Sequence, residues 1–534
     1  MTQSQPVGTI SGEVQPMTFK IQLSDKTIGH GTYVKIKHDV HGWVLARIEF
    51  MKRYLDDFDE VETIASCRTI GYKEDNNILM PKTPFGPNEK VFLADDKLIT
   101  DMLGIQSRRE GNIYLGFLEG HNIPVYIDVK KTIAKHVSVL AKTGAGKSYT
   151  VGVLLEELLK TDIAIVIIDP HGEYGSLRYD NDDYDGMLKY NVQVRNYADK
   201  VTEYATNLEI NTGARKIILQ PKFDMMELSN IMPMRLLDKE KAVLYSALKD
   251  LEETGYEDYT IEDLVRKVEE QPTNLKWKVL SGLEALQESG VFEGAPVPLT
   301  QLVKKGAASI INLKGTEPHI QHLVVAKIAK DLFDARCVGK IDEVFILVEE
   351  AHNFCPERGF GDVISSGILR TIASEGRKFG INLCVVSQRP ARVDKNVLSQ
   401  CNTQIILKVT NPNDLRAIGQ SIEGFSAGME NEIKQLSVGH ALIVGECVEQ
   451  PITVDIRVRE TKHMGSVAIK KEDDVPEEIK EKAERMKKKH KEMLERKQKG
   501  KPGEERREKT FWDMIVGFFI EDWKEAENRA EKEK

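Results

Sequence analysis

The segment at residues 141–148, with the sequence AKTGAGKS, is the strongest candidate for chemistry in this chain. Glycines let backbone N–H groups turn inward around phosphate oxygens, and a following helix directs its positive end at the same point. We expect Lys147 to reach the β- and γ-phosphates of ATP and the Ser148 hydroxyl to bind Mg²⁺. The motif predicts a phosphate loop whose nucleotide-binding residues are Thr143, Gly144, Ala145, Gly146, Lys147, Ser148 and Tyr149.

A pair of carboxylates is the second candidate. Five apolar residues at 344–348 are followed by Glu349 and Glu350. A buried strand with this pattern delivers acidic groups to its carboxyl end, which is the sheet edge where the phosphate loop also lies. We assign Glu349 to holding Mg²⁺ through water and Glu350 to polarising the attacking water. The two motifs together predict ATP hydrolysis.

Two further polar residues end apolar runs in the same way. Asp169 follows residues 163–168, and Gln388 follows residues 383–387. We expect both at the nucleotide edge, where Gln388 would sense the γ-phosphate or orient water. The structural alternatives are a cap of the following turn for Asp169 and a plain turn for Gln388.

The elements that must position these residues alternate in type after residue 104. Apolar runs between helical stretches predict a parallel sheet covered on both faces. These runs lie at residues 137–140, 163–168, 309–313, 344–348, 383–386 and 404–407. We therefore divide the α/β core into residues 104–221 and 299–459, with a Met-, Leu-, Glu- and Lys-rich helical insertion at 222–298.

The two ends of the chain have a different texture. Residues 1–103 contain short strand-like runs with turn signals, which predict an all-β barrel for assembly or docking, without catalytic residues. Residues 460–534 form a tail of mixed charge with an apolar helix at 511–520. That helix could pack on the body of the protein, on another protein or on a membrane surface.

Composition limits the partners. The chain has 534 residues and a net charge of −9, so it is not a basic nucleic-acid coat, and any DNA contact must gather positive charge locally. None of the six cysteines forms a C-x-x-C pair, so no zinc cluster is expected. The sequence has no signal peptide and no run of 18 uncharged apolar residues. We expect a cytoplasmic protein that does not contact a membrane.

The combination of motifs resembles the HerA family, archaeal and bacterial hexameric DNA translocases related to the FtsK pumps. The resemblance extends over roughly residues 6–460. It rests on the N-terminal β-domain and on the segments 141–148, Asp169-Pro170-His171-Gly172-Glu173, Glu349-Glu350-Ala351-His352, Glu375-Gly376-Arg377-Lys378 and Ser387-Gln388-Arg389-Pro390. The usual loop begins with Gly where this chain has Ala141, which the turn tolerates if its φ is negative.

The resemblance implies a RecA-like P-loop ATPase that acts as a homo-hexameric ring on double-stranded DNA. It implies a barrel that docks a NurA-like nuclease and a role in resecting double-strand DNA ends. Arg377 looks like the arginine that reaches a neighbour's nucleotide, with Arg370 a weaker candidate, and Lys135 and His136 are further candidates near the nucleotide. Arg358, in the glycine-flanked segment 356–361, is a candidate DNA contact or a plain surface residue.

Two other functions remain open at this stage. One is another DNA-pumping ATPase of the same superfamily, such as a conjugative or packaging motor. The other is a nucleotide-gated scaffold that moves nothing. DNA-stimulated ATP turnover separates the motors from the scaffold, while the sequence does not distinguish a duplex pump from a single-strand helicase.

Overall fold

The computed structural model describes residues 5–463, except residues 26, 56–60, 76, 224–227, 230, 233, 235, 254–258 and 362. These described residues belong to one compact unit, Met1–Gly465. The apolar helix predicted at 511–520 lies outside them. Within the described residues, no helix is both long and apolar enough to cross a lipid bilayer.

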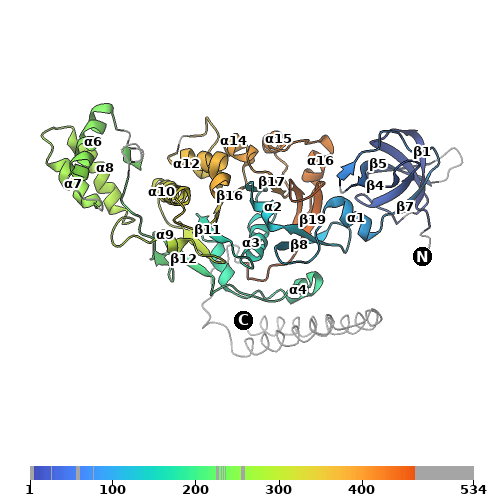
Figure 1. Ribbon diagram of the computed structural model, residues 1–534, viewed down its shortest axis with the longest axis horizontal. Coiled ribbons are helices and arrows are strands. Elements are labelled where there is room, and N and C mark those ends of the chain that lie inside the picture. Colours follow the sequence, from blue (N-terminus) through green and yellow to red (C-terminus); the bar gives the residue numbers. More distant parts are fainter. Residues whose placement is uncertain are drawn as a thin grey trace, which may run out of the picture. The chain divides into compact units, whose positions relative to one another are not determined.

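The N-terminal residues form a closed barrel, as the sequence predicts (Figure 1). Six strands follow one another in the order β2-β1-β7-β3-β4-β5, and pairing of β2 with β5 closes the ring. Alternate residues such as Val34, Ile36, Val44 and Ile48 fill the interior. The strands are β1 (Gly8–Val14), β2 (Thr18–Leu23), β3 (Tyr33–His38), β4 (Gly42–Leu55), β5 (Val61–Glu74) and β7 (Lys90–Leu93), and β6 (Asn77–Leu79) adds to β5.

The stretch predicted as an all-β domain, residues 1–103, ends in a helix that the sequence pattern did not predict. Helix α1 (Asp96–Leu103) begins where the Asp95 side chain accepts a hydrogen bond from the Leu98 N–H. It ends at Gly104, whose φ of 72° is in the left-handed region that favours glycine. Its buried residues pack with the core of the α/β domain and not with the barrel interior. The barrel itself therefore ends near Leu93.

A twelve-stranded mixed sheet forms the core. Its order is β13-β12-β14-β11-β15-β16-β10-β17-β18-β19-β8-β9. The strands from β13 to β17 in this order run parallel. They are β13 (Arg215–Lys216), β12 (Val201–Ala205), β14 (Ala308–Asn312), β11 (Ala164–Asp169), β15 (Val344–Val348), β16 (Ile381–Ser387), β10 (Val137–Leu140) and β17 (Thr403–Ile406).

The other edge of this sheet is antiparallel, whereas the sequence pattern predicted a parallel sheet. It consists of β18 (His440–Val444), β19 (Ile452–Ile456), β8 (Asn112–Leu118) and β9 (Pro124–Asp128). The β8–β9 and β18–β19 hairpins have short connections, which antiparallel neighbours allow and parallel ones do not.

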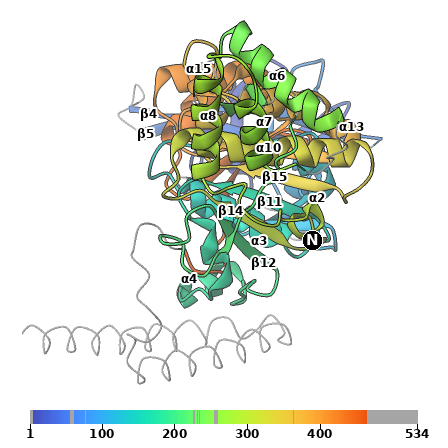
Figure 2. The same cartoon turned by 90° about the vertical axis from the view of Figure 1, so that its left-hand side faces the viewer.

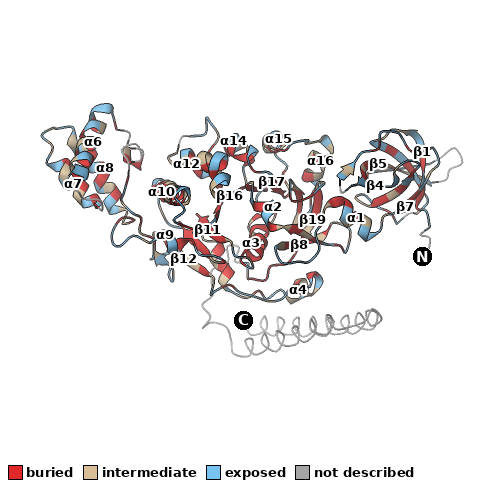
Figure 3. Cartoon of the chain, in the orientation of Figure 1, coloured by how far each residue is buried: buried red, intermediate tan, exposed pale blue. Residues whose placement is uncertain are grey.

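Helices cover both faces of the parallel strands, as predicted. Along β11, Ala164, Val166 and Ile168 enter one hydrophobic cluster, and Ile165 and Ile167 enter the other. The strands are accordingly buried on both sides (Figure 3). One face carries α10 (Pro318–Cys337), α12 (Ser365–Thr371), α15 (Pro412–Ser421) and α16 (Ala427–Gln435), and the other carries α2 (Val129–Ile133) and α3 (Lys147–Leu158).

Helices also occupy the predicted insertion. Helices α6 (Asp238–Glu253), α7 (Ile261–Glu269) and α8 (Lys276–Glu288) pack on one another at one end of the compact unit (Figure 1), and this end faces the viewer in Figure 2. Helix α7 begins with a capping box in which Thr260 and Asp263 satisfy each other's backbone N–H groups.

Helix α3, which follows the phosphate loop, is anchored by a buried ion network. The Arg457 guanidinium, just beyond β19, contacts Glu156 at 2.9 Å and Glu157 at 2.7 Å. All three side chains are almost fully buried. Buried charges persist only when paired and hydrogen-bonded, so this network fixes α3 against the antiparallel edge of the sheet.

Candidate active site

The phosphate loop connects β10 to α3 with the backbone geometry that phosphate binding requires. Gly144 and Gly146 have φ values of 77° and 97°, which a side chain would strain. The buried Ala141 does not have a positive φ, so its departure from the usual glycine is accommodated. The loop thus leads into the N-terminus of a helix of 12 residues, which is a ready site for an anion.

Five of the predicted residues meet at the carboxyl edge of the sheet. The Lys147 ammonium contacts Glu349 and lies 2.7 Å from Glu350. The Gln388 amide donates to Glu350 at 2.8 Å, and its oxygen accepts from the Thr143 hydroxyl at 2.5 Å. Strand register explains this meeting, because Leu140 pairs with Ser387 and Val348 pairs with Val385.

Glu350 has a strained backbone. Its φ of 49° and ψ of 46° are left-handed, which is uncommon for a residue other than glycine. One carboxylate oxygen serves Lys147 and Gln388, while the other has no hydrogen-bond partner and lies 3.2 Å from His352. Strain and an unsatisfied buried oxygen are typical of a residue kept for function rather than stability.

Two residues at this site were not assigned a role from the sequence. The hydroxyl of Tyr174, which is fully buried in η1 (Tyr174–Arg178), donates to the second oxygen of Glu349. The His352 Nδ1 lies 3.1 Å from the Ser387 hydroxyl. His352 stands within the quoted motif at 349–352, which was the available signal, whereas Tyr174 is 175 residues from its partner and gives no local pattern.

Asp169 reaches the site indirectly. It is fully buried, and its carboxylate accepts from the backbone N–H groups of Gly172 at 2.8 Å and Tyr174 at 2.9 Å. Burial raises its pKa to about 6, while these hydrogen bonds oppose the shift. Asp169 therefore caps the turn that presents Tyr174, which is the structural alternative considered from the sequence, and direct contact with a nucleotide stays a prediction.

The electrostatics of the cluster separate the two glutamates. Burial raises the pKa of Glu349 to about 7, although Lys147 and Tyr174 oppose the shift. For Glu350, burial is outweighed by Lys147 and the pKa is lowered. Burial also opposes the charge on Lys147, but the two carboxylates raise its pKa. A charged lysine and an ionised Glu350 at neutral pH are what a general base beside a phosphate requires.

The remaining nucleotide-loop residues lie around this cluster. Ser148 is half-buried beside Lys147 on α3. Tyr149 faces the end of the β19 segment instead, because its hydroxyl accepts from the Arg459 N–H at 3.0 Å and its ring meets that of His463. Its assignment to nucleotide binding stays a prediction.

Arg377 is not brought to this cluster. It is exposed at the start of α13 (Arg377–Phe379), four residues before β16 begins. Gln388 follows the other end of that seven-residue strand, so the two ends are separated by about 20 Å at 3.3 Å per residue. Arg370 is engaged by Asp394 at 2.7 Å.

Lys135 and His136 also lie at the amino edge, before β10. Lys135 forms an ion pair with Glu446. His136 is buried, accepts from the Leu383 N–H at 2.8 Å and contacts the Ala373 carbonyl at 3.0 Å. Burial lowers its pKa to about 4, so it is a neutral structural residue. Arg358 is exposed in the loop after α11 (Ala351–Phe354), and its DNA contact stays a prediction.

The residues present fit ATP and Mg²⁺. A left-handed glycine loop and a buried lysine suit phosphates. The Ser148 hydroxyl and the Glu349 carboxylate are oxygen donors, and Mg²⁺ is typically held by one or two such groups together with phosphates and water. Among the described residues there is no cluster of three or more His, Cys, Asp or Glu side chains for a metal held by the protein alone.

Comparison with known proteins agrees with this geometry. Residues 113–332 match the family model "Helicase HerA, central domain". The DNA double-strand break repair helicase HerA of Saccharolobus solfataricus is 29% identical over 86% of this chain and 94% of its own length. The probable HerA of Methanocaldococcus jannaschii is 28% identical over 84% and 94%. The chain is therefore similar to HerA helicases over most of its length. It is an ATP-hydrolysing enzyme with a P-loop core.

Among solved structures, VirB4 of Thermoanaerobacter pseudethanolicus resembles this chain with a TM-score of 0.49 at 18% identity. The match covers 66% of this chain and 97% of that one.

Proposed function

We propose that this ATPase is a translocase or helicase on double-stranded DNA that works as a hexameric ring in DNA double-strand break repair. The names of its relatives supply the DNA substrate and the repair setting. A NurA-like nuclease docked on the N-terminal barrel would consume the DNA ends that the motor feeds to it. A cytoplasmic location follows from that substrate.

The placement of Arg377 is the observation that carries the ring. The hydrolytic cluster lies at the carboxyl edge of the sheet, and Arg377 is exposed at the amino edge about a strand length away. It cannot serve its own subunit's phosphates without dismantling β16. If Arg377 stabilises charge on a transferred phosphoryl group, it would therefore do so in a neighbouring subunit, as in enzymes whose arginine is supplied in trans.

Hydrolysis itself would use the residues of the cluster. Bound Mg²⁺ would neutralise charge on the β- and γ-phosphates. Lys147 would leave the two carboxylates for the phosphate oxygens, which frees Glu350 to accept a proton from the attacking water. Gln388, which already contacts Glu350 at 2.8 Å, would orient that water. Ser148 and Glu349 would hold the ion, with Tyr174 fixing Glu349.

One experiment tests the motor. The ATPase rate is measured with and without linear duplex DNA, beside the native mass of the assembly. We expect a mass of six chains and a rate that rises with duplex. A rate that ignores both duplex and single-stranded DNA would favour the nucleotide-gated scaffold, and a rate stimulated by single strands alone would replace the duplex pump with a helicase that tracks one strand.

A second experiment tests the role of Arg377 in trans. Two inactive proteins, Arg377→Ala and Glu350→Gln, are mixed and allowed to exchange subunits. An arginine acting in trans predicts partial recovery, because some interfaces then pair an intact Glu350 with an intact Arg377. No recovery at any mixing ratio, with exchange verified by mass, would mean that Arg377 acts within its own subunit.

A further inference from the structure

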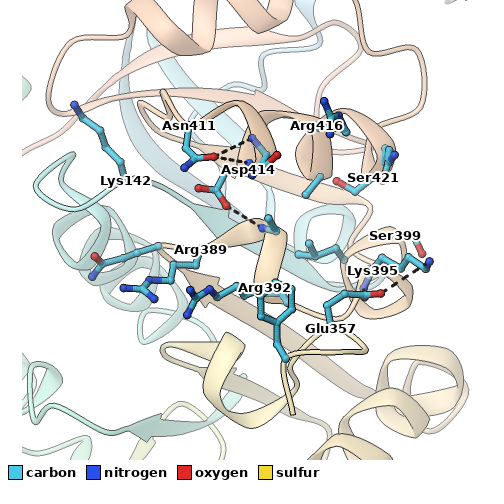
Figure 4. Close-up of a pocket in the computed structure, with 18 of the residues that line it drawn as sticks. Lys142, Glu357, Arg389, Arg392, Lys395, Ser399, Asn411, Asp414, Arg416 and Ser421 are labelled. Carbon is cyan, nitrogen blue, oxygen red and sulfur yellow. Dashed lines mark hydrogen bonds and ion pairs between the residues drawn. The ribbon is translucent and has the colours of Figure 1, made fainter. Parts of the chain in front are cut away.

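A pocket of about 1050 Å³ opens next to the nucleotide cluster and is not explained by ATP hydrolysis (Figure 4). Thr143 and Gln388 form its border with the cluster. The rest of its wall comes from the loop after α11, from residues 389–399 after β16, and from α15 with the loop before it. Three separate segments thus converge on one cavity at the carboxyl edge of the sheet.

The pocket gathers positive charge in a protein whose net charge is −9. Five cationic side chains line it, against two acidic ones. The cations are Lys142, Arg389, Arg392, Lys395 and Arg416, and the acids are Glu357 and Asp414. Because charges attract over roughly 10 Å in salt, such a local cluster acts on an anion regardless of the net charge of the chain.

The two acids are committed to the backbone. Asp414 accepts from the Ala391 N–H at 3.0 Å. Glu357 accepts from the Lys395 N–H at 2.8 Å and also lies 3.9 Å from the Lys395 ammonium, which it faces across the pocket wall (Figure 4). The side chains of Arg389, Arg392 and Arg416 are exposed. Within the described part of the chain, none of the three forms an ion pair with a carboxylate.

An aromatic side chain accompanies the arginines. Phe360, in the loop after α11, is 59% exposed, and the Arg392 guanidinium lies 5.4 Å from the centre of its ring. In proteins that bind single-stranded nucleic acid, an exposed aromatic face stacks on a base while neighbouring cations contact the phosphates. The glycine loop and Lys147 already suit the phosphates of ATP, so this second cationic site is suited to a different anion.

We propose that this pocket binds the sugar–phosphate backbone of DNA through Arg389, Arg392 and Arg416. The inference rests on the proposed function, because it names where the moving substrate is held. It also supplies a physical link to hydrolysis. Arg389 follows Gln388 directly, and the backbone N–H of Arg389 donates to the Ser387 hydroxyl at 3.0 Å. That hydroxyl contacts His352, which lies beside Glu350. A phosphate drawn to Arg389 would therefore shift groups that touch the general base.

The test compares charge-removing variants in the assembled full-length protein. Arg392→Gln and Arg416→Gln remove cations from two different walls of the pocket. Lys239→Gln, on the exposed side of α6 in the insertion, removes the same charge far along the chain and is the matched control. Affinity for a fluorescein-labelled linear duplex is measured by anisotropy at several salt concentrations.

Each lost phosphate contact should reduce the slope of log affinity against log salt by about 0.9. We expect that reduction in both arginine variants and not in Lys239→Gln, with similar loss for duplexes of unrelated sequence. Wild-type slopes in both arginine variants, or equal losses in the control, would overturn the proposal while leaving the motor function intact.

Weaker binding of an ATP analogue with unchanged DNA slopes would overturn the proposal too, because the cavity would then serve the nucleotide. A wild-type protein that binds neither duplex nor single-stranded DNA would refute the proposed function itself, and this inference with it.

Discussion

Replacing Tyr174 with phenylalanine removes one hydroxyl from the interior and should change how the ATPase depends on pH. That hydroxyl donates to Glu349, and both side chains are fully buried. A hydrogen bond to a charged group contributes about 1.5–3 kcal/mol, and one pKa unit corresponds to about 1.36 kcal/mol. Since the bond stabilises the carboxylate, its loss should raise the pKa of Glu349 by about one to two units above its present value of about 7.

The pH dependence of the ATPase should report whether the Glu349 side chain is protonated or ionised. In the proposed role of Glu349, only its ionised carboxylate would hold Mg²⁺, so activity should fall as pH drops through the pKa of Glu349. In Tyr174→Phe that fall should begin at a higher pH. At pH 7 the ionised fraction would drop from roughly half to between about 1% and 10%, a loss of about 5- to 50-fold in kcat/KM. Near pH 9.5 the variant should recover most of the wild-type rate.

The assay measures kcat/KM for ATP across pH, because this ratio reports ionisations of the free enzyme. The matched control is Tyr197→Phe, which removes another buried hydroxyl, bonded to Glu460 at 2.7 Å away from the cluster. The control should lose stability without moving the profile. A Tyr174→Phe profile parallel to that of the wild type, lower by one factor at every pH, would refute the reasoning, since the hydroxyl would then not act through ionisation of Glu349.

Other variants test the remaining assignments. Lys147→Ala should abolish ATP turnover, whereas Glu350→Gln should bind ATP without hydrolysing it; equal loss of binding in both would contradict the separate roles. Lowering the pH from 6.5 to about 4 should cost about 3 kcal/mol of stability, because burial keeps His136 neutral when folded and the unfolded chain takes up its proton first. His136→Asn, which suits the left-handed backbone at this position, should flatten that dependence in denaturant titrations. Arg457→Met should lower the free energy of unfolding by about 3–5 kcal/mol, because Glu156 and Glu157 would be left buried without their cation. Denaturant titration would measure this loss as a lower midpoint.

The position of a site residue could be predicted from the sequence where an apolar run next to it identifies a buried strand. The strands at 137–140 and 344–348 agree with the structure at both ends, because a nearly continuous apolar run between helical stretches is typical of a strand buried on both faces. The charged residues after them are then placed by topology, since the carboxyl ends of parallel strands share an edge. Hence the meeting of Lys147, Glu350 and Gln388 could be anticipated before any coordinates.

Pairings between distant segments have no such pattern. Tyr174 and Glu349 are separated by 175 residues, and Arg457 by 301 from Glu156. Each pairing is decided by which side chains the folded sheet brings into one small volume, and nothing in the local sequence states it. The antiparallel edge was missed for a related reason, because β8 and β19 are neighbours in the sheet but far apart along the chain.

The strained turn at Glu350 shows why residue type alone does not define this site. Val348 still pairs with Val385, and Ala351 is already helical, so the chain must turn within two residues. A left-handed residue achieves that turn at a cost of order 1–3 kcal/mol. With relaxed backbone angles the turn would lengthen and carry the carboxylate away from Gln388. The strained turn therefore lets the two consecutive glutamates point in different directions. Glu349 points toward Tyr174, and Glu350 points toward Gln388 and His352.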